Sequence, residues 1–275
     1  MDFEKVNCVF ETVEDVYTCK VPVMTASSPN FQFNGQHLDG KNDSEVESLI
    51  IESGLMPYLS NQIFANFSIL DTVKIGAVGL QCIDRNSFRD AKNLEILEIE
   101  GNSLRSLAPD AFFDCENLTE LFLGSNEIMF LDPKAFSNNK ELTTIFFRSN
   151  KLDFLDKNQF ADNLQIRSID FIDNNLQQLD SNIFVNLEQL EFIGLSGNKL
   201  QFIDAHLFAN NPNLLTIWLA ENQINSVDAK AFQNNKKLET LVLRSNPLKV
   251  LNENILSENP ELQEVQFSNK FCGIS

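Results

Sequence analysis

The chain has 275 residues, 43% of them hydrophobic, and carries a formal net charge of −18 at pH 7. Its lysines and arginines form no run or stripe, which argues against nucleic acid as a partner because phosphate binding needs a basic surface. No uninterrupted apolar stretch approaches the roughly 18 residues of a membrane span, so we expect no membrane span.

The first 45 residues lack the period that governs the rest of the chain, and we expect residues 1–45 to form an N-terminal cap and entry segment. Cys8 and Cys19 lie there, in CVFETVEDVYTC. Two short extended segments predict a disulfide-tied hairpin, a common cover for the exposed end of a stack of repeats outside the cell. The start, MDFEKVNCVF, lacks a basic region followed by an apolar core, so no signal peptide is visible.

From residue 46 to residue 275 the chain repeats a frame of 24 residues, LxxLxLxxNxLxxLxxxxFxxxxx. The repeats begin at Val46, Leu70, Leu94, Leu118, Leu142, Ile166, Leu190, Leu214, Leu238 and Leu262, the last of them incomplete. Position 9 of the frame is asparagine in seven of them, at Asn102, Asn126, Asn150, Asn174, Asn198, Asn222 and Asn246. Self-similarity at this period is typical of a solenoid built from stacked turns.

Each column of the frame predicts a place in the fold. Positions 4 and 6 point into the core, and positions 3, 5 and 7 point away from it, because side chains alternate along a strand. The strands of successive turns are expected to stack in parallel. The asparagine amide both donates and accepts, so we expect it to bond neighbouring turns. A phenylalanine at position 19 forms an outer spine, and an aspartate at position 15 caps a single helical turn.

This frame resembles the extracellular, typical 24-residue class of leucine-rich repeat proteins, which includes receptor ectodomains, matrix proteins and small secreted insect proteins. The resemblance covers residues 46–271, and the cysteine hairpin is a looser match. It implies an α/β solenoid of about ten repeats, a curved horseshoe with a parallel β-sheet on the concave face and short helical turns on the convex face. It also implies binding through the concave sheet, in innate defence or adhesion.

Aromatic and arginine side chains gather at positions 3, 5 and 7 of the middle repeats. These residue types are frequent in binding hot spots, so we expect a ligand site on the concave face. Its candidate residues are Phe122, Phe146, Arg148, Asp170, Ile172, Phe192, Trp218 and Arg244. Cross-strand packing, by which aromatic residues stabilise a sheet, is the alternative explanation for the same side chains.

Three further cysteines have no partner that the sequence identifies. We expect Cys82 and Cys115 to be small packed residues, and Cys272 to be either a buried thiol or an intermolecular bridge in a homodimer through the C-terminal end. Three sequons give candidate N-glycosylation sites at Asn42, Asn66 and Asn117. Together with the Cys8 and Cys19 pair, they predict a secreted, extracellular protein.

Catalysis has little support in the sequence, and we expect no enzyme activity, no cofactor and no metal site. The two histidines, His37 and His206, lie far apart, in the entry segment and on a convex turn, and one aspartate per turn offers too few ligands for calcium. The sequence therefore predicts a noncatalytic extracellular recognition module that binds a protein or glycan ligand, or a receptor, through its concave sheet. A component of the extracellular matrix and a cytosolic repeat scaffold are the alternatives.

Overall fold

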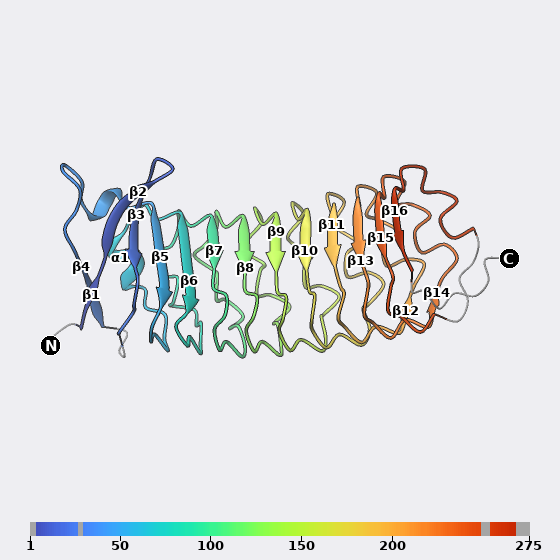
Figure 1. Cartoon of the computed structure of the whole chain (residues 1–275), viewed down its shortest axis with the longest axis horizontal. Helices are drawn as coiled ribbons and strands as arrows, with labels where there is room; N and C mark the ends of the chain where they lie inside the picture. Colours follow the sequence, from blue (N-terminus) through green and yellow to red (C-terminus); the bar gives the residue numbers. More distant parts are fainter. Residues whose placement is uncertain (1–3, 27–29, 249–253, 268–275) are drawn as a thin grey trace.

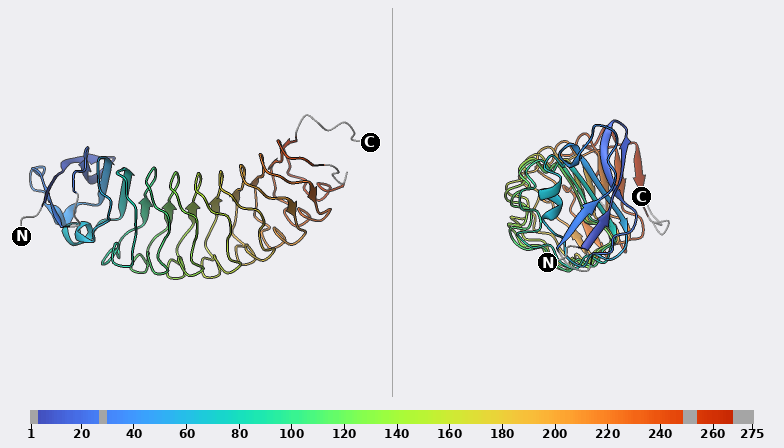
Figure 2. Two further views of the ribbon diagram at one scale, coloured as in Figure 1. Left: turned by 90° about the horizontal axis from the view of Figure 1, so that it is seen from below. Right: turned by 90° about the vertical axis from the view of Figure 1, so that its left-hand side faces the viewer.

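The computed structural model describes residues 4–26, 30–248 and 254–267. Its turns stack side by side along one axis, and each contributes one strand to a shared sheet (Figure 1). The stack is curved, and the loops opposite the sheet follow the outer side of the arc (Figure 2). This arrangement is the predicted repeat solenoid.

In the part of the chain that the structure describes, the main sheet has 12 strands in the spatial order β16-β15-β13-β11-β10-β9-β8-β7-β6-β5-β3-β2. In chain order its strands are β2 (Val9–Val13), β3 (Val16–Val21), β5 (Ser48–Ser53), β6 (Thr72–Ala77), β7 (Ile96–Glu98), β8 (Glu120–Phe122), β9 (Thr144–Phe146), β10 (Ser168–Asp170), β11 (Phe192–Gly194), β13 (Thr216–Trp218), β15 (Thr240–Val242) and β16 (Glu264–Gln266). All neighbours pair in parallel except the β2–β3 hairpin. Smaller pairs join β1 (Glu4–Asn7) to β4 (Phe31–Asn34) and β12 (Phe202–Ile203) to β14 (Ser226–Val227). Within the described residues the helical elements are the 3-10 helix η1 (Asp43–Glu45) and the α-helix α1 (Gln62–Asn66).

Neighbouring repeat strands pair with an offset of one whole repeat, so each column of the frame becomes a row across the sheet. Leu97 pairs with Leu121, and Leu121 pairs with Ile145. These position-4 side chains are fully buried, as is Ile99 at position 6. The predicted alternation along the strands is confirmed in these rows. Position 5 departs from it at Asp170 and Val242, which are buried, and position 7 departs from it at Ala220.

The asparagines at position 9 join each turn to the one before it. Oδ1 of Asn174 accepts the N–H of Leu152 at 3.0 Å, and its Nδ2 donates to the carbonyls of Phe147 at 2.9 Å and Phe171 at 3.1 Å. The same bond to the preceding turn recurs along the column. The predicted bonding between turns is confirmed, and its partners are backbone groups. The preceding residue, Asp173, has a φ of 55°, because the chain reverses sharply there.

Phenylalanine rings at position 19 stack opposite the sheet, from Phe64 to Phe232, with successive centroids 5.4 to 6.5 Å apart. Before them, the aspartates at position 15 accept a backbone N–H two residues on, as Asp132 does from Lys134 at 2.8 Å. These bonds close single hydrogen-bonded turns on the convex side. In the ranges that the structure describes, the turn becomes an α-helix at α1 alone.

The N-terminal hairpin continues the sheet beyond the first repeat. Cys8 and Cys19 form a disulfide, and Cys19 pairs with Leu49 of β5. Cys19 thus fills the buried row that position 4 fills in the repeats. We propose residues 1–45 as the cap of the repeats in residues 46–275. Cys272 and its expected roles lie outside the described residues.

The other two cysteines differ from each other. Cys115 is fully buried, as expected, and desolvation raises the pKa of its thiol, which therefore stays protonated and unreactive. Cys82 is exposed, which corrects the expectation of a packed residue. It occupies position 13 of the frame, and other residues at this position are exposed as well.

Candidate functional site

The eight predicted ligand-binding residues form two adjacent groups along the concave sheet. The first group contains Phe122 of β8, Phe146 of β9, Arg148 two residues after β9, and Asp170 of β10. The second group comes from the turns of β10 to β15, and it contains Ile172, Phe192, Trp218 and Arg244. The two groups differ in what they leave open to a ligand.

The side chains of the first group contact one another in pairs. The rings of Phe122 and Phe146 meet edge to face, with centroids 5.3 Å apart. Arg148 Nε lies 3.2 Å from Oδ2 of Asp170, whose Oδ1 accepts the backbone N–H of Ile172 at 2.7 Å. Asp170 is only 2% exposed, which corrects the expectation of an open side chain at position 5. Cross-strand packing is therefore a substantial role of this group.

Burial also controls the charge of the carboxyl groups around Arg148. Desolvation raises the pKa of Asp170, and the N–H that it accepts and the Arg148 guanidinium lower it by less. Glu100 and Arg148 both reach the space that a side chain at Gly124 would occupy. The pKa of Glu100 is raised too, first by burial and then by Glu98. The folded state therefore favours protonation of both carboxyl groups.

Replacing Asp170 by asparagine is expected to flatten the pH dependence of stability below neutral pH. The raised pKa means that the folded protein holds this proton more tightly than the unfolded chain, in which the carboxyl titrates near pH ~4. The stabilisation from this proton is present at low pH and is lost as the pH rises from about 4 through the raised pKa. Asparagine keeps an acceptor for the Ile172 N–H. Urea unfolding at several pH values measures the effect, and a constant difference between Asp170→Asn and the unmodified chain contradicts it.

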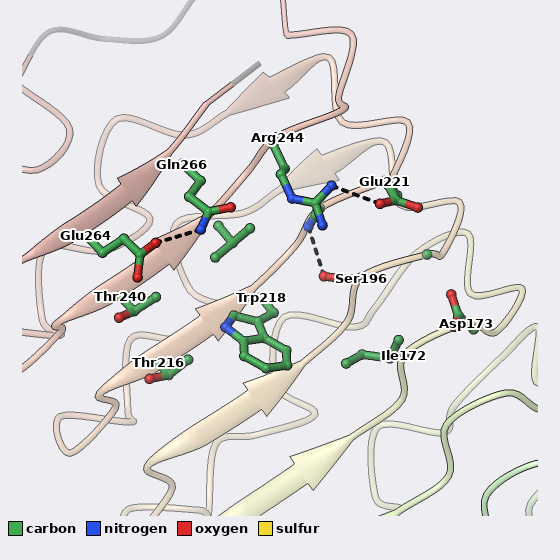
Figure 3. A pocket seen from close by; sticks show the side chains of 13 residues that line it. Ile172, Asp173, Ser196, Thr216, Trp218, Glu221, Thr240, Arg244, Glu264 and Gln266 are labelled. Atoms are coloured by element: carbon green, nitrogen blue, oxygen red, sulfur yellow. Dashed lines mark hydrogen bonds and ion pairs between the residues drawn. The ribbon is translucent and has the colours of Figure 1, made fainter. Parts of the chain in front are cut away.

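Three residues of the second group, Ile172, Trp218 and Arg244, border a hollow of about 530 Å³ on the C-terminal part of the concave sheet (Figure 3). The hollow exists because three of its lining residues are small, namely Ser196, Gly197 and Ala220. The larger side chains of Ile172 and Trp218 stand beside it. The hydroxyl of Ser196 accepts the backbone N–H of Ala220 at 3.0 Å, which fixes this part of the lining.

Trp218 is the largest side chain of the hollow and is 36% exposed. Its ring meets Phe192 edge to face, with centroids 5.0 Å apart, so Phe192 supports the indole without lining the hollow. Arg244 Nη1 lies 3.0 Å from Oε1 of Glu221. The structure thus brings three of the predicted residues together around the hollow, Ile172, Trp218 and Arg244. It leaves the other five outside, Phe122, Phe146, Arg148, Asp170 and Phe192.

Sequence reasoning missed the carboxylates that line the hollow, Asp173, Glu221 and Glu264. Asp173 and Glu221 stand at position 8, where the backbone is left-handed, and Glu264 stands at position 3 of β16. The eight predicted residues stand mainly at positions 5 and 7. The acidic residues at position 8 of the repeats near Trp218, Asp173 and Glu221, were the signal in the sequence that could have indicated these carboxylates.

A second surface that sequence reasoning missed lies at position 13, away from the strands of the main sheet. About half of each aromatic side chain there is exposed, at Tyr58, Phe130, Phe154 and Phe202. A hollow of about 650 Å³ lies between Phe154 and Phe202, beside the partly buried Leu179. We call this surface the flank. The recurrence of aromatic residues at position 13 was the signal for it.

The titratable side chains do not gather into a metal site in the part of the chain that the structure describes. No set of three or more histidine, cysteine, aspartate or glutamate side chains there is placed to hold a metal ion. His206 lies beside Asp204 at 3.1 Å, and His37 lies in the cap between Tyr17 and Asp43. None of the helices in the described ranges is long and apolar enough to cross a membrane.

Comparisons with known proteins agree on the architecture. The family model described as leucine rich repeat matches overlapping segments of the chain, residues 69–128, 92–152, 116–171, 140–200, 193–248 and 212–269. No curated protein matches the sequence. Among solved structures, the APL1 leucine-rich repeat domain is similar with a TM-score of 0.72 and 17% identity, over 97% of this chain and 71% of that chain. A leucine-rich repeat protein of Leptospira interrogans is similar with a TM-score of 0.66 and 19% identity, over 82% of this chain and 67% of that chain.

The Toll–Spatzle complex of Drosophila is also similar, with a TM-score of 0.52 and 17% identity over 88% of this chain. The present chain spans 41% of the matched chain of that complex. Identities this low show a shared fold. The family matches extend from residue 69 to residue 269, well over half of the chain, and domains of this kind are protein-interaction modules that are typically noncatalytic. The chain belongs to the leucine-rich repeat family.

Proposed function

We propose that this protein is an extracellular recognition module that binds a protein or glycan ligand through its concave sheet. The hollow beside Trp218 is the observation that carries the proposal. A tryptophan that is 36% exposed, beside Arg244 in a recess, combines two residue types that dominate binding hot spots. Packing of the sheet does not require this exposure, since Val242 at the same position of the next repeat is buried.

Two features support a location outside the cell. The cap contains the Cys8–Cys19 disulfide, and disulfides persist mainly in oxidising compartments. The sequons at Asn42, Asn66 and Asn117 all lie in the N-terminal half of the chain. Because the hollow is built from the C-terminal turns, glycans at these asparagines would leave it open to a ligand.

The likeness to the Toll–Spatzle complex supports a role in innate defence, and adhesion is the other role that the repeat frame itself implies. That complex is described as a molecular hub in Drosophila development and innate immunity. A recognition role of this kind needs one soluble ligand. Assembly of the protein into a matrix without such a ligand is the outcome that favours the structural alternative.

Binding measurements on substituted proteins test the proposal. The native, glycosylated protein is used to isolate its ligand by affinity, and the Kd is then measured for each variant. We expect Trp218→Ala to weaken binding by about 2 kcal/mol or more, roughly 30-fold, with little change in Tm. Phe146→Ala is expected to weaken binding by a smaller factor, because its ring lies outside the hollow and packs on Phe122 at 5.3 Å.

Phe154→Ala is the matched control, because it removes an exposed aromatic ring from the flank instead of the concave sheet. Unchanged binding in this variant is expected. If Phe154→Ala loses affinity while Trp218→Ala keeps it, the ligand binds the flank. If both concave variants unfold the protein, their side chains serve packing alone.

A further inference from the structure

The hollow beside Trp218 carries surplus negative charge. Its lining contains three carboxylates and one guanidinium, which belong to Asp173, Glu221, Glu264 and Arg244. Arg244 is already paired with Glu221 at 3.0 Å. Among the described residues, neither Asp173 nor Glu264 has a cationic partner, and Glu264 accepts only the side-chain amide of Gln266, at 2.6 Å. A ligand group that enters the hollow therefore meets two carboxylates that no charged side chain among the described residues balances.

Trp218 adds a second preference for a cation. An aromatic ring attracts an ammonium or guanidinium group over its face, and tryptophan does so most strongly. Phe192 meets the indole edge to face at 5.0 Å, and Trp218 remains 36% exposed beside the hollow. A sugar ring also stacks on tryptophan, but a neutral sugar leaves the charge of Asp173 and Glu264 unbalanced. Ring and carboxylates together favour a positively charged group.

The size of the hollow and the charge of the whole chain favour a protein as the source of that group. A volume of about 530 Å³ holds a long side chain together with part of the peptide that presents it. Glu264 and Asp173 stand on different sides of Trp218 (Figure 3). A net charge of −18 would also accelerate the approach of a basic partner.

We propose that this hollow binds a basic segment of a protein ligand, with one lysine or arginine side chain over the Trp218 ring. Further cationic groups of the same segment lie by Asp173 and by Glu264, which stand four strands apart at about 4.8 Å per strand. This inference rests on the proposed function, and it names the class of ligand that the concave site selects. Arg244 stays paired with Glu221 and sets one border of the site. The ligand segment is therefore basic, and an acidic segment is repelled.

The fluorescence of Trp218 tests this directly, because the chain contains a single tryptophan. The full chain is titrated with decalysine, with decaglutamate and with a neutral oligosaccharide of N-acetylglucosamine. We expect a saturable change of emission with decalysine alone. The apparent affinity is expected to fall roughly tenfold when the salt concentration rises from about 20 mM to about 500 mM, because salt screens exposed charges.

Charge-neutral variants separate the site from the overall acidity. Glu264→Gln and Asp173→Asn are each expected to weaken the decalysine response by about three- to fivefold. Glu120→Gln is the matched control, since Glu120 stands at position 3 of β8 as Glu264 does in β16, and it changes the net charge equally. We expect its response to equal that of the unmodified chain.

Three outcomes overturn the inference. They are an emission that does not respond to decalysine, a response that Glu120→Gln weakens as much as Glu264→Gln does, and an equal response to the oligosaccharide. The isolated native ligand separates this failure from that of the proposed function. If Trp218→Ala loses the ligand while Asp173→Asn and Glu264→Gln keep it, the concave site stands and its preference for a cation is wrong. If Trp218→Ala keeps the ligand, the concave site itself is wrong.

Discussion

Replacing Phe184 by alanine is expected to lower the free energy of unfolding by about 3–5 kcal/mol. Phe184 is fully buried, and its ring stacks on Phe160 at 6.5 Å and on Phe208 at 6.2 Å. Because each turn of a solenoid is stabilised by its neighbours alone, the cavity weakens two interfaces at once. Urea unfolding followed by circular dichroism measures the loss.

Phe154→Ala is the control for this prediction, since it removes the same atoms from a ring that is 50% exposed. We expect a loss of about 1 kcal/mol or less, because little apolar area leaves the core. Equal losses for Phe184→Ala and Phe154→Ala would show that the spine at position 19 does not carry the stability that its burial indicates.

The fold could be predicted from the sequence because each column of the frame has the same environment in every turn. Leu121 and Ile145 lie opposite each other since the repeat length equals the pairing offset of the strands. The asparagine at position 9 meets the same backbone groups in each turn, so one chemical argument serves the whole column. The Cys8–Cys19 hairpin followed from a short local segment in the same way.

The candidate site depends on differences between turns, which the frame does not contain. Asp170 and Trp218 share position 5, but they are 2% and 36% exposed. The Asp170 carboxylate is paired with Arg148 and accepts the backbone N–H of Ile172. Trp218 instead borders the hollow, where the neighbouring Ala220 has a small side chain. The depth of a recess is set by such combinations of side chains on neighbouring strands. A pattern read along one column cannot give it.

A second column of buried asparagines was missed for a related reason. It stands at position 22 and contains Asn139, Asn163, Asn211, Asn235 and Asn259. Each donates from Nδ2 to two carbonyls of the preceding turn. Cys115 and Leu187 occupy the same position in other turns. Because the residue type at position 22 varies, the sequence pattern does not reveal this column, although each asparagine in it makes the same two hydrogen bonds.

Asn174→Leu is expected to lower the free energy of unfolding by about 3 kcal/mol. Oδ1 of Asn174 accepts the buried N–H of Leu152, and the described residues offer that N–H no other acceptor. Leucine has a similar size but leaves this N–H without an acceptor. The Phe147 carbonyl loses the bond from Asn174 at 2.9 Å and keeps the bond from Nδ2 of Asn150 at 3.1 Å. Each unsatisfied buried polar group costs about 1–3 kcal/mol. The denaturant midpoint and the m-value of the variant give the change in the free energy of unfolding.

Asn235→Leu provides the comparison, and we expect it to cost about 1 kcal/mol. Nδ2 of Asn235 donates to the carbonyls of Phe208 and Asn211, but both carbonyls also accept a backbone N–H of their own turn. Its Oδ1 has no hydrogen-bond partner within the described chain, so leucine removes an unsatisfied oxygen as well as two bonds. Leu187 already fills the equivalent place. A larger loss for Asn174→Leu means that position 9 is asparagine because a backbone N–H needs its acceptor, whereas equal losses mean that both columns serve only to fill space.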